Sequence, residues 1–395
     1  MTERSTTNTL SIRLREIRKR RLLSQRQLAE LSGVSKSWIA AIEQGADVDV
    51  RLETVRKLAV ALRVSTTQLL AEGDDSRKDP MPIVDLAPWE QTRLALLGQL
   101  PPPDDEPTVD GVLEALGEIV PLLADNLYRD IADRLPELLC DADALNGEGR
   151  TAQARVLNAT GWLMVQMRQF DLAEVALSRA IDLANDRLDA AAAVNTQVWL
   201  HLRKGELDQG RALAIRWADD MEPRFSRASN AELCLWGRLL LGIANAGVRD
   251  NRPGEAEDAL QLARAAAVRV GRETLSDTST ARTFGPVTVS MIAAESAVIL
   301  DQPERALAIA DRISARVPYA NSASRNRHKL DTAAALVATR RHSEAWNVLS
   351  QLRHASPEWL RTQRYARDIL RQIIARRRSL NEEIRSLADE MALTY

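Results

Sequence analysis

The chain has 395 residues with a formal net charge of −2, and 45% of its residues are hydrophobic, 27% charged and two are cysteines. This length predicts two or more folding units of an ordinary globular protein, and no apolar run is long enough to suggest a membrane protein. Both cysteines, Cys140 and Cys234, are expected to be core thiols in a reducing compartment, without a disulfide or metal role.

The charge is unevenly distributed along the chain. Residues 1–70 contain thirteen basic and seven acidic side chains, a net charge of +6, so the acidic balance belongs to the remainder. A small basic domain on a near-neutral protein indicates polyanion binding at one end of the chain. Residues 1–9 are polar and are predicted to be a flexible arm.

Residues 24–45 contain two short helices joined by a sharp turn. Gly33 suits the turn because it tolerates a positive φ, and Ser35 is placed to cap the second helix. The second helix has an apolar face made by Val34, Ile39 and Ile42. Its outward face is small or polar and carries no carboxylate, which fits a DNA major groove. Further helices are predicted over residues 10–22, 51–63 and 66–71.

An ordered set of residues in this region resembles the phage-repressor-like (XRE-type) helix-turn-helix family. The matching positions are Leu14, Arg15, Arg18, Leu23, Ser24, Gln25, Leu28, Ala29, Gly33, Val34, Ser35, Ile39, Glu43 and Gly45. The resemblance implies a five-helix DNA-binding domain over residues 10–72. It also implies that Arg18 and Glu43 form an internal ion pair.

The resemblance assigns DNA contacts to two groups of residues. Base edges would be met by Lys36, Ser37 and Ala41, and phosphates by Gln25, Arg26, Ser35 and Gln44. Trp38 lies beside them, and it either packs against the preceding helix or lies along the sugar–phosphate backbone.

Residues 73–108 are acidic and rich in proline, which predicts a linker. A short helix is expected within this linker, around Trp89 and residues 94–97.

Residues 109–395 are predicted to be helical throughout, because apolar residues recur with a helical period. Five hairpin turns each precede a small residue, namely Ala173, Gly210, Ala256, Ala306 and Ala345. Gly161, Ala173, Leu177 and Ala180, with Pro318 and Pro357 at the ends of later units, resemble the tetratricopeptide-repeat family. The predicted fold is therefore all-α, a helix-turn-helix domain followed by a tetratricopeptide-like α-solenoid.

Two helices of the predicted solenoid share an Asn–Trp spacing. Asn158 and Trp162 lie four residues apart, as do Asn195 and Trp199, and Asn245 falls at the equivalent position of the next unit. These side chains either line a ligand-binding groove or wedge the core between repeats. The segment 282–286 with Glu295 either lines a pocket or forms a loop between repeats.

No pattern of an enzyme, metal site or cofactor site is found. The four histidines lack metal-ligand spacing, and no glycine-rich phosphate loop is present. Arginines cluster over residues 361–378, where they form either a solvated face or a second nucleic-acid surface. The last predicted helix, over residues 380–393, caps the array or mediates dimerisation.

The two halves together resemble the peptide-pheromone receptor regulators of Gram-positive bacteria. This resemblance implies a cytoplasmic homodimer that binds a pseudo-palindromic operator in double-stranded DNA and a peptide or small-molecule effector. The alternative is an adaptor whose repeat array binds a protein partner, with the DNA-binding domain acting as a tether.

Overall fold

The structure is a computed structural model that describes residues 5–46, 50–70, 87–145, 147–277, 279–313 and 322–393. Over these residues it contains twenty-one α-helices, two short 3-10 turns and one two-stranded hairpin, so the all-α prediction is confirmed. The N-terminal domain comprises α1 (Ser5–Arg20), α2 (Gln25–Ser32), α3 (Lys36–Glu43), α4 (Leu52–Leu62) and α5 (Thr66–Leu69). Residues 5–9, predicted to belong to a flexible arm, are helical because α1 begins at Ser5, and residues 1–4 lie outside the described ranges.

Local signals in the sequence position α2 and α3. Ser24 and Gln27 form a capping box, in which Ser24 Oγ accepts from the Gln27 amide at 3.2 Å. Gly33 ends α2 in the left-handed region, with φ +68°. The predicted apolar face of α3 is confirmed, since Ile39 and Ile42 are 0% and 2% exposed.

Part of the predicted linker is folded and packs against the repeat region. Residues 71–86 lie outside the described ranges, but a 3-10 turn (Ala87–Trp89) and α6 (Glu90–Leu96) contact α8 (Tyr128–Ala144). Trp89 and Leu96 are 5% and 2% exposed. The apolar side chains of this segment therefore join the core of the repeat region, together with α7 (Val109–Asp125), although its flanks are acidic and rich in proline.

Five helical hairpins form the body of the molecule. They pair α9 (Arg150–Gln166) with α10 (Phe170–Leu183), α11 (Arg187–Lys204) with α12 (Leu207–Asp220), α13 (Asn230–Arg249) with α14 (Pro253–Val270), α15 (Pro286–Ile299) with α16 (Pro303–Ala310), and α17 (Ser322–Ala338) with α18 (His342–Ala355). All five turns lie where the sequence places them, and the small residue after each turn is buried.

The five turns share one backbone feature. The residue five positions before each small residue has a positive φ; these residues are Arg168, Gly205, Asn251, Asp301 and Arg340. Each left-handed residue ends the first helix, and the second helix begins two residues later. The repeat thus has a regular turn, although only one of the five positions is glycine.

A short β-hairpin interrupts the helices and was not predicted. Strands β1 (Thr274–Leu275) and β2 (Thr283–Phe284) pair antiparallel between α14 and α15. Phe284 is fully buried against Gly237 of α13, where an added Cβ would lie 2.1 Å from the phenyl ring. Strands of two residues are too short to give an alternating pattern, so the sequence alone reads this segment as an inter-helix loop.

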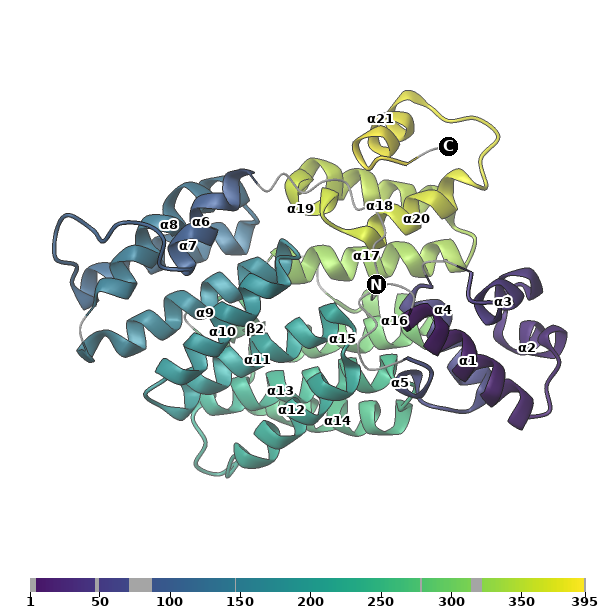
Figure 1. Cartoon of the computed structure of the whole chain (residues 1–395), viewed down its shortest axis with the longest axis horizontal. Coiled ribbons are helices and arrows are strands. Elements are labelled where there is room, and N and C mark those ends of the chain that lie inside the picture. The colour runs from purple at the N-terminus through teal and green to yellow at the C-terminus, as the bar shows by residue number, and fades with distance from the viewer. Residues whose placement is uncertain are drawn as a thin grey trace.

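The two ends of the array share one apolar core. Figure 1 shows α6–α8 at the left of the view, beside α17 and α19 (Pro357–Arg361). Residues of α6–α10 and of α17, α18, α19, α20 (Arg364–Ile374) and α21 (Glu382–Glu390) belong to a single apolar cluster. Ile384 and Leu387 of α21 are buried in it, so the last helix closes the end of the array.

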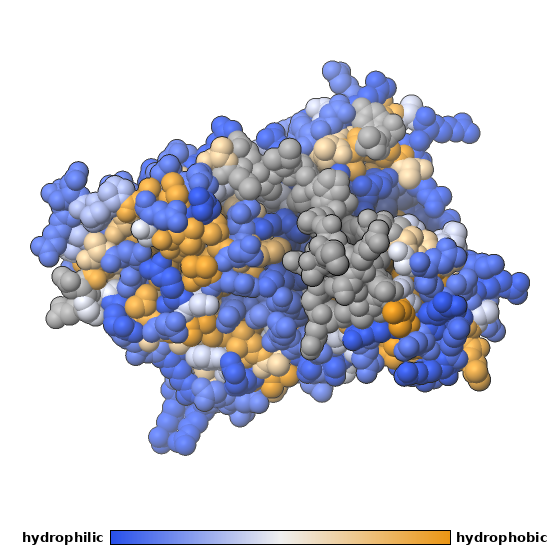
Figure 2. All heavy atoms as spheres, in the orientation of Figure 1, coloured by the Kyte–Doolittle hydropathy of each residue, from blue (hydrophilic) through white to orange (hydrophobic). Residues whose placement is uncertain are grey.

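Most of the face drawn in Figure 2 is hydrophilic, with apolar residues gathered over the α6–α10 end. Among the described residues, α13 is long and apolar enough to span a membrane by length and composition. However, 78% of its apolar window is buried within the fold, as expected for a central core helix.

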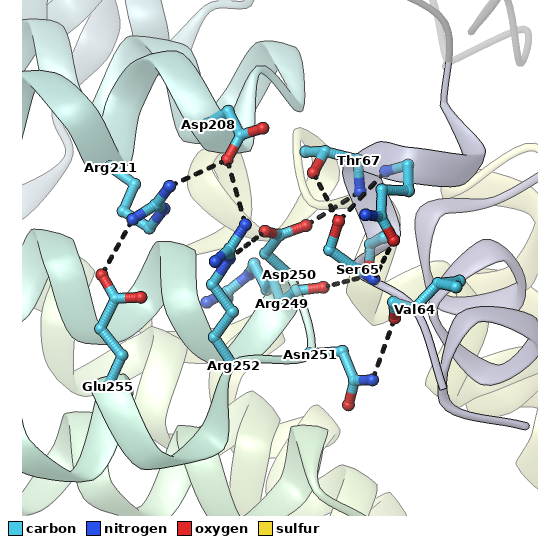
Figure 3. Close-up of polar contacts among 12 residues, drawn as sticks. Val64, Ser65, Thr67, Asp208, Arg211, Arg249, Asp250, Asn251, Arg252 and Glu255 are labelled. Atoms are coloured by element: carbon cyan, nitrogen blue, oxygen red, sulfur yellow. Dashed lines mark hydrogen bonds and ion pairs between the residues drawn. The ribbon is translucent and has the colours of Figure 1, made fainter. Parts of the chain in front are cut away.

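The N-terminal domain docks on the array through α5. Thr66 Oγ1 donates to the carbonyl oxygen of Arg249 at 2.8 Å, and the Thr67 amide donates to Asp250 Oδ1 at 2.9 Å. Figure 3 shows this seam at the turn between α13 and α14. Thr66 and Asp250 are both fully buried, so the seam excludes water.

Two arginines of the N-terminal domain extend the contact. Arg56 of α4 is 7% exposed and donates from Nε to the carbonyl oxygen of Val248 at 3.2 Å. Arg51 forms an ion pair with Asp368 of α20 at 2.7 Å. The domain is therefore attached at two places, to the α13–α14 turn and to the C-terminal helices.

Replacing Thr66 by valine is expected to loosen this seam. Valine keeps the shape but removes the hydroxyl donor, leaving the Arg249 carbonyl short of one buried partner at a cost of about 1–2 kcal/mol. Amide hydrogen exchange in α5 should then be about tenfold faster or more. The matched control is Thr67→Val, since Thr67 reaches Asp250 through its backbone amide. Equal protection in both variants would contradict a role for the Thr66 hydroxyl.

Candidate nucleic-acid interface and central cavity

The N-terminal end of α3 is exposed and rich in hydrogen-bond donors. Ser35 caps the helix, and its Oγ accepts from the Trp38 amide at 3.2 Å and contacts Ser37 Oγ at 3.2 Å. Lys36 is exposed and makes no ion pair with the described residues. This part of α3 therefore offers an ammonium, two hydroxyls and a helix N-terminus to a partner.

The remaining predicted DNA-contact residues differ in their exposure and in whether their side chains form an ion pair. Gln44 is exposed and Ala41 is half-buried, both on or next to α3. Arg26 is exposed and pairs with Glu30 at 3.3 Å, an arrangement that a phosphate can replace at little cost. Trp38 is 37% exposed and lies outside the domain's apolar cluster, which favours the surface alternative for its indole.

Gln25 is not free. Its side-chain amide donates to Glu43 Oε2 at 2.9 Å, inside a buried network. In the same network, Arg18 Nε and Nη2 donate to the two oxygens of Glu43 at 2.5 and 2.8 Å. The internal Arg18–Glu43 ion pair is thus confirmed, and Gln25 supports it from α2.

The pair also fixes the charge state of Glu43. Burial opposes ionisation, but the hydrogen bonds from Arg18 and Gln25 outweigh it and hold the pKa of Glu43 below its ordinary value. The carboxylate therefore joins α1, α2 and α3 as an ionised group, through its hydrogen bonds to Arg18 and Gln25.

The docking seam leaves α3 uncovered by the array. In Figure 1, α2 and α3 lie at the outer right edge, whereas α5 faces the array. The exposed end of α3 and the docked helices thus belong to different faces of the N-terminal domain.

A cavity of about 310 Å³ lies among α9, α11, α13, α15, α17 and α19. Of the five predicted groove residues, Trp162, Trp199 and Asn245 line it. The two indole rings lie 6.0 Å apart between centroids and are tilted by 31°. Asn245 Oδ1 accepts from Arg249 at 3.2 Å. Arg282 and Glu295 also line the cavity. Of the two alternatives for segment 282–286 with Glu295, this placement favours a pocket.

Asn158 and Asn195 do not line this cavity. Asn158 donates to Ser279 Oγ and accepts from Thr196 Oγ1, each at 2.8 Å, beside a separate cavity of about 140 Å³. Asn195 is 2% exposed, and its Nδ2 has no hydrogen-bond partner among the described residues. The structure therefore brings together the two tryptophans and Asn245, but places these two asparagines in the core.

Of the arginines that line the cavity, sequence reasoning singled out only Arg282. Six line the cavity, namely Arg168, Arg203, Arg238, Arg249, Arg282 and Arg327. They come from five different helices or loops far apart in sequence, so no local sequence pattern indicates that they line one cavity. Among the described residues, no group of three or more His, Cys, Asp or Glu is placed to hold a metal.

Comparisons with known proteins concern the N-terminal domain. Residues 9–72 match the family described as "Helix-turn-helix domain". Over 67 residues the chain is 33% identical to the HTH-type transcriptional regulator SinR of Bacillus licheniformis. This match covers 17% of the chain and 60% of SinR, so the chain spans about three fifths of that relative's length. No solved structure matches the chain.

Proposed function

We propose that the chain is a sequence-specific DNA-binding transcriptional regulator of the XRE type. The exposed N-terminal end of α3, with Lys36 and without a carboxylate, is the observation that carries the proposal. The +6 charge of residues 1–70 and the helix-turn-helix match over residues 9–72 support it. In this proposal Lys36, Ser37 and Ala41 meet base edges, while Arg26, Ser35 and Gln44 meet phosphates.

The regulator is proposed to act as a homodimer on a pseudo-palindromic operator. A single domain of this size buries little DNA surface, so two copies related by a two-fold axis supply affinity and specificity together. The helical hairpins form a tetratricopeptide-like array that holds the N-terminal domain through α5 and takes up an effector. The protein would act in the cytoplasm, at its operator.

Two substitutions separate sequence reading from general DNA affinity. Lys36→Ala is expected to cost about 1–3 kcal/mol of discrimination at the contacted base pair. Arg26→Ala should weaken all sequences alike and reduce the salt slope by about one, because it removes a phosphate contact. Both effects are measured by gel shift at two salt concentrations, on a site selected from random double-stranded DNA and on scrambled DNA.

Lys19→Ala is the matched control, since Lys19 is an exposed lysine at the end of α1. It should leave the preference for the selected site unchanged. If Lys36→Ala behaves as Lys19→Ala does, α3 does not read the bases.

A further inference from the structure

The central cavity contains more positive charge than its own carboxylates offset. Six arginines line it, against Glu295 and Asp331. Glu295 is already shared, because it accepts from Arg249 at 2.6 Å and from Arg327 at 3.0 Å. Burial and the neighbouring Glu295 raise the pKa of Asp331, which weakens its contribution of negative charge.

Three of these arginines have no carboxylate partner among the described residues. Arg238 and Arg282 each reach a backbone carbonyl, at 3.4 Å, whereas the side chain of Arg203 makes no hydrogen bond to a described residue. The Nε atoms of Arg203 and Arg238 are buried without a partner. Proteins rarely leave buried guanidinium donors unpaired, because the desolvation is not repaid.

Burial disfavours the charged form of these arginines and lowers their pKa values. Burial lowers the pKa of Arg203 to about 9 and that of Arg238 to about 10. The other cavity arginines add repulsion at Arg203. Burial also lowers the pKa of Arg282 well below its ordinary value. Arg203 and Arg238 remain protonated at neutral pH, so an anion that enters the cavity meets preformed cations.

Aromatic side chains form a wall beside the cations. Trp162 and Trp199 face each other as a tilted pair, and the guanidinium of Arg282 lies 5.8 Å from the Trp199 ring centroid. Trp359 adds a third indole, 2% exposed. This arrangement accepts a planar apolar group next to an anionic one.

We propose that the cavity binds a small organic anion, with phosphate or carboxylate groups held by Arg203, Arg238 and Arg282 and a planar part against Trp162 and Trp199. A volume of about 310 Å³ is at the lower end for small-molecule pockets and leaves no room for an extended peptide. The inference rests on the effector part of the proposed function and names the class of effector.

The test uses the full chain with two simple probes, inorganic pyrophosphate for the phosphate class and citrate for the carboxylate class. Calorimetry should detect binding of at least one probe, and Arg203→Met should weaken that binding at least tenfold. Arg264→Met is the matched control, since Arg264 is half-exposed on α14, paired with Glu257, and away from the cavity. The probe that binds more tightly identifies the class.

The basic N-terminal domain is a second place for anions to bind, so both variants are also tested by gel shift. Arg203→Met should bind DNA as tightly as the unchanged protein. Because the Arg203 side chain has no hydrogen-bond or carboxylate partner among the described residues, its replacement should also raise the melting temperature of the ligand-free chain.

Binding of neither probe, or equal binding by the two variants, would overturn the anion site without affecting the DNA proposal. Failure of the Lys36→Ala test would overturn base reading by α3 and leave the anion site intact. The two inferences can therefore fail separately.

Discussion

Replacing Glu295 by glutamine is expected to lower the free energy of unfolding by about 3–5 kcal/mol. The carboxylate is 6% exposed and accepts from Arg249 and Arg327. Glutamine keeps the volume but removes the charge, leaving both guanidiniums in a cavity that already holds unpaired cations. Chemical denaturation measures the loss, and the midpoint should fall without a change in slope.

Glu257→Gln is the matched control for this experiment. Glu257 also contacts two arginines, Arg264 at 3.1 Å and Arg305 at 3.7 Å, but its side chain is 39% exposed. Its replacement should cost less than about 1 kcal/mol, because water solvates the freed groups. Glu295→Asp, which keeps the charge, should be the milder of the two changes at position 295. If Glu257→Gln and Glu295→Gln cost the same, burial of the ion pair is not what makes Glu295 important.

Replacing Glu43 by glutamine should have a comparable effect on the N-terminal domain, about 3–5 kcal/mol. Glu43 is 8% exposed and is bound through both oxygens by Arg18 and through one by Gln25. The change leaves Arg18 buried opposite a neutral amide. DNA affinity should fall with stability, because the same carboxylate positions α3 against α1.

The effect of Glu43→Gln should depend on pH. Since the folded-state pKa of Glu43 is depressed, its contribution to stability is present above the unfolded-state pKa and is lost as the pH falls through the folded-state value. The difference in melting temperature between the unchanged protein and the variant should thus be large at pH 7 and shrink below about pH 4. Glu30→Gln, which removes an exposed partner of Arg26, should show little difference at either pH. A difference that stays constant with pH would contradict an ionised Glu43.

Features that depend on contacts between residues close in sequence were predictable from the sequence. The cap at Ser35 and the turn at Gly33 separate α2 from α3, and each depends on contacts within four residues. The five hairpin turns of the array were predictable for the same reason. The packing of Trp89 was not, because its 3-10 turn packs against α8, far along the chain, and its flanks resemble a spacer.

The central cavity depends on how the hairpins stack, so the sequence predicted it only in part. The Asn–Trp spacing drew attention to Trp162 on α9 and Trp199 on α11, which both line the cavity. The same spacing suggested Asn158 as a groove residue. Its side-chain amide instead donates to Ser279, which lies in the hairpin segment that was not predicted. The six arginines come together only when the hairpins stack. An isolated arginine on a helix is ordinarily a surface residue, so its sequence position gives no sign of a cavity.

Arg249 lies where the cavity meets the docking seam. Its guanidinium contacts Glu295 in the cavity, and its carbonyl oxygen accepts from Thr66 of the N-terminal domain. A ligand that competes for Glu295 or repels it would change the end of α13 on which α5 sits. If the proposed ligand changes DNA affinity through this contact, thermodynamic reciprocity requires that DNA change ligand affinity by the same factor. Arg249, at the end of α13, would then contribute to the coupling free energy between the two proposed binding sites.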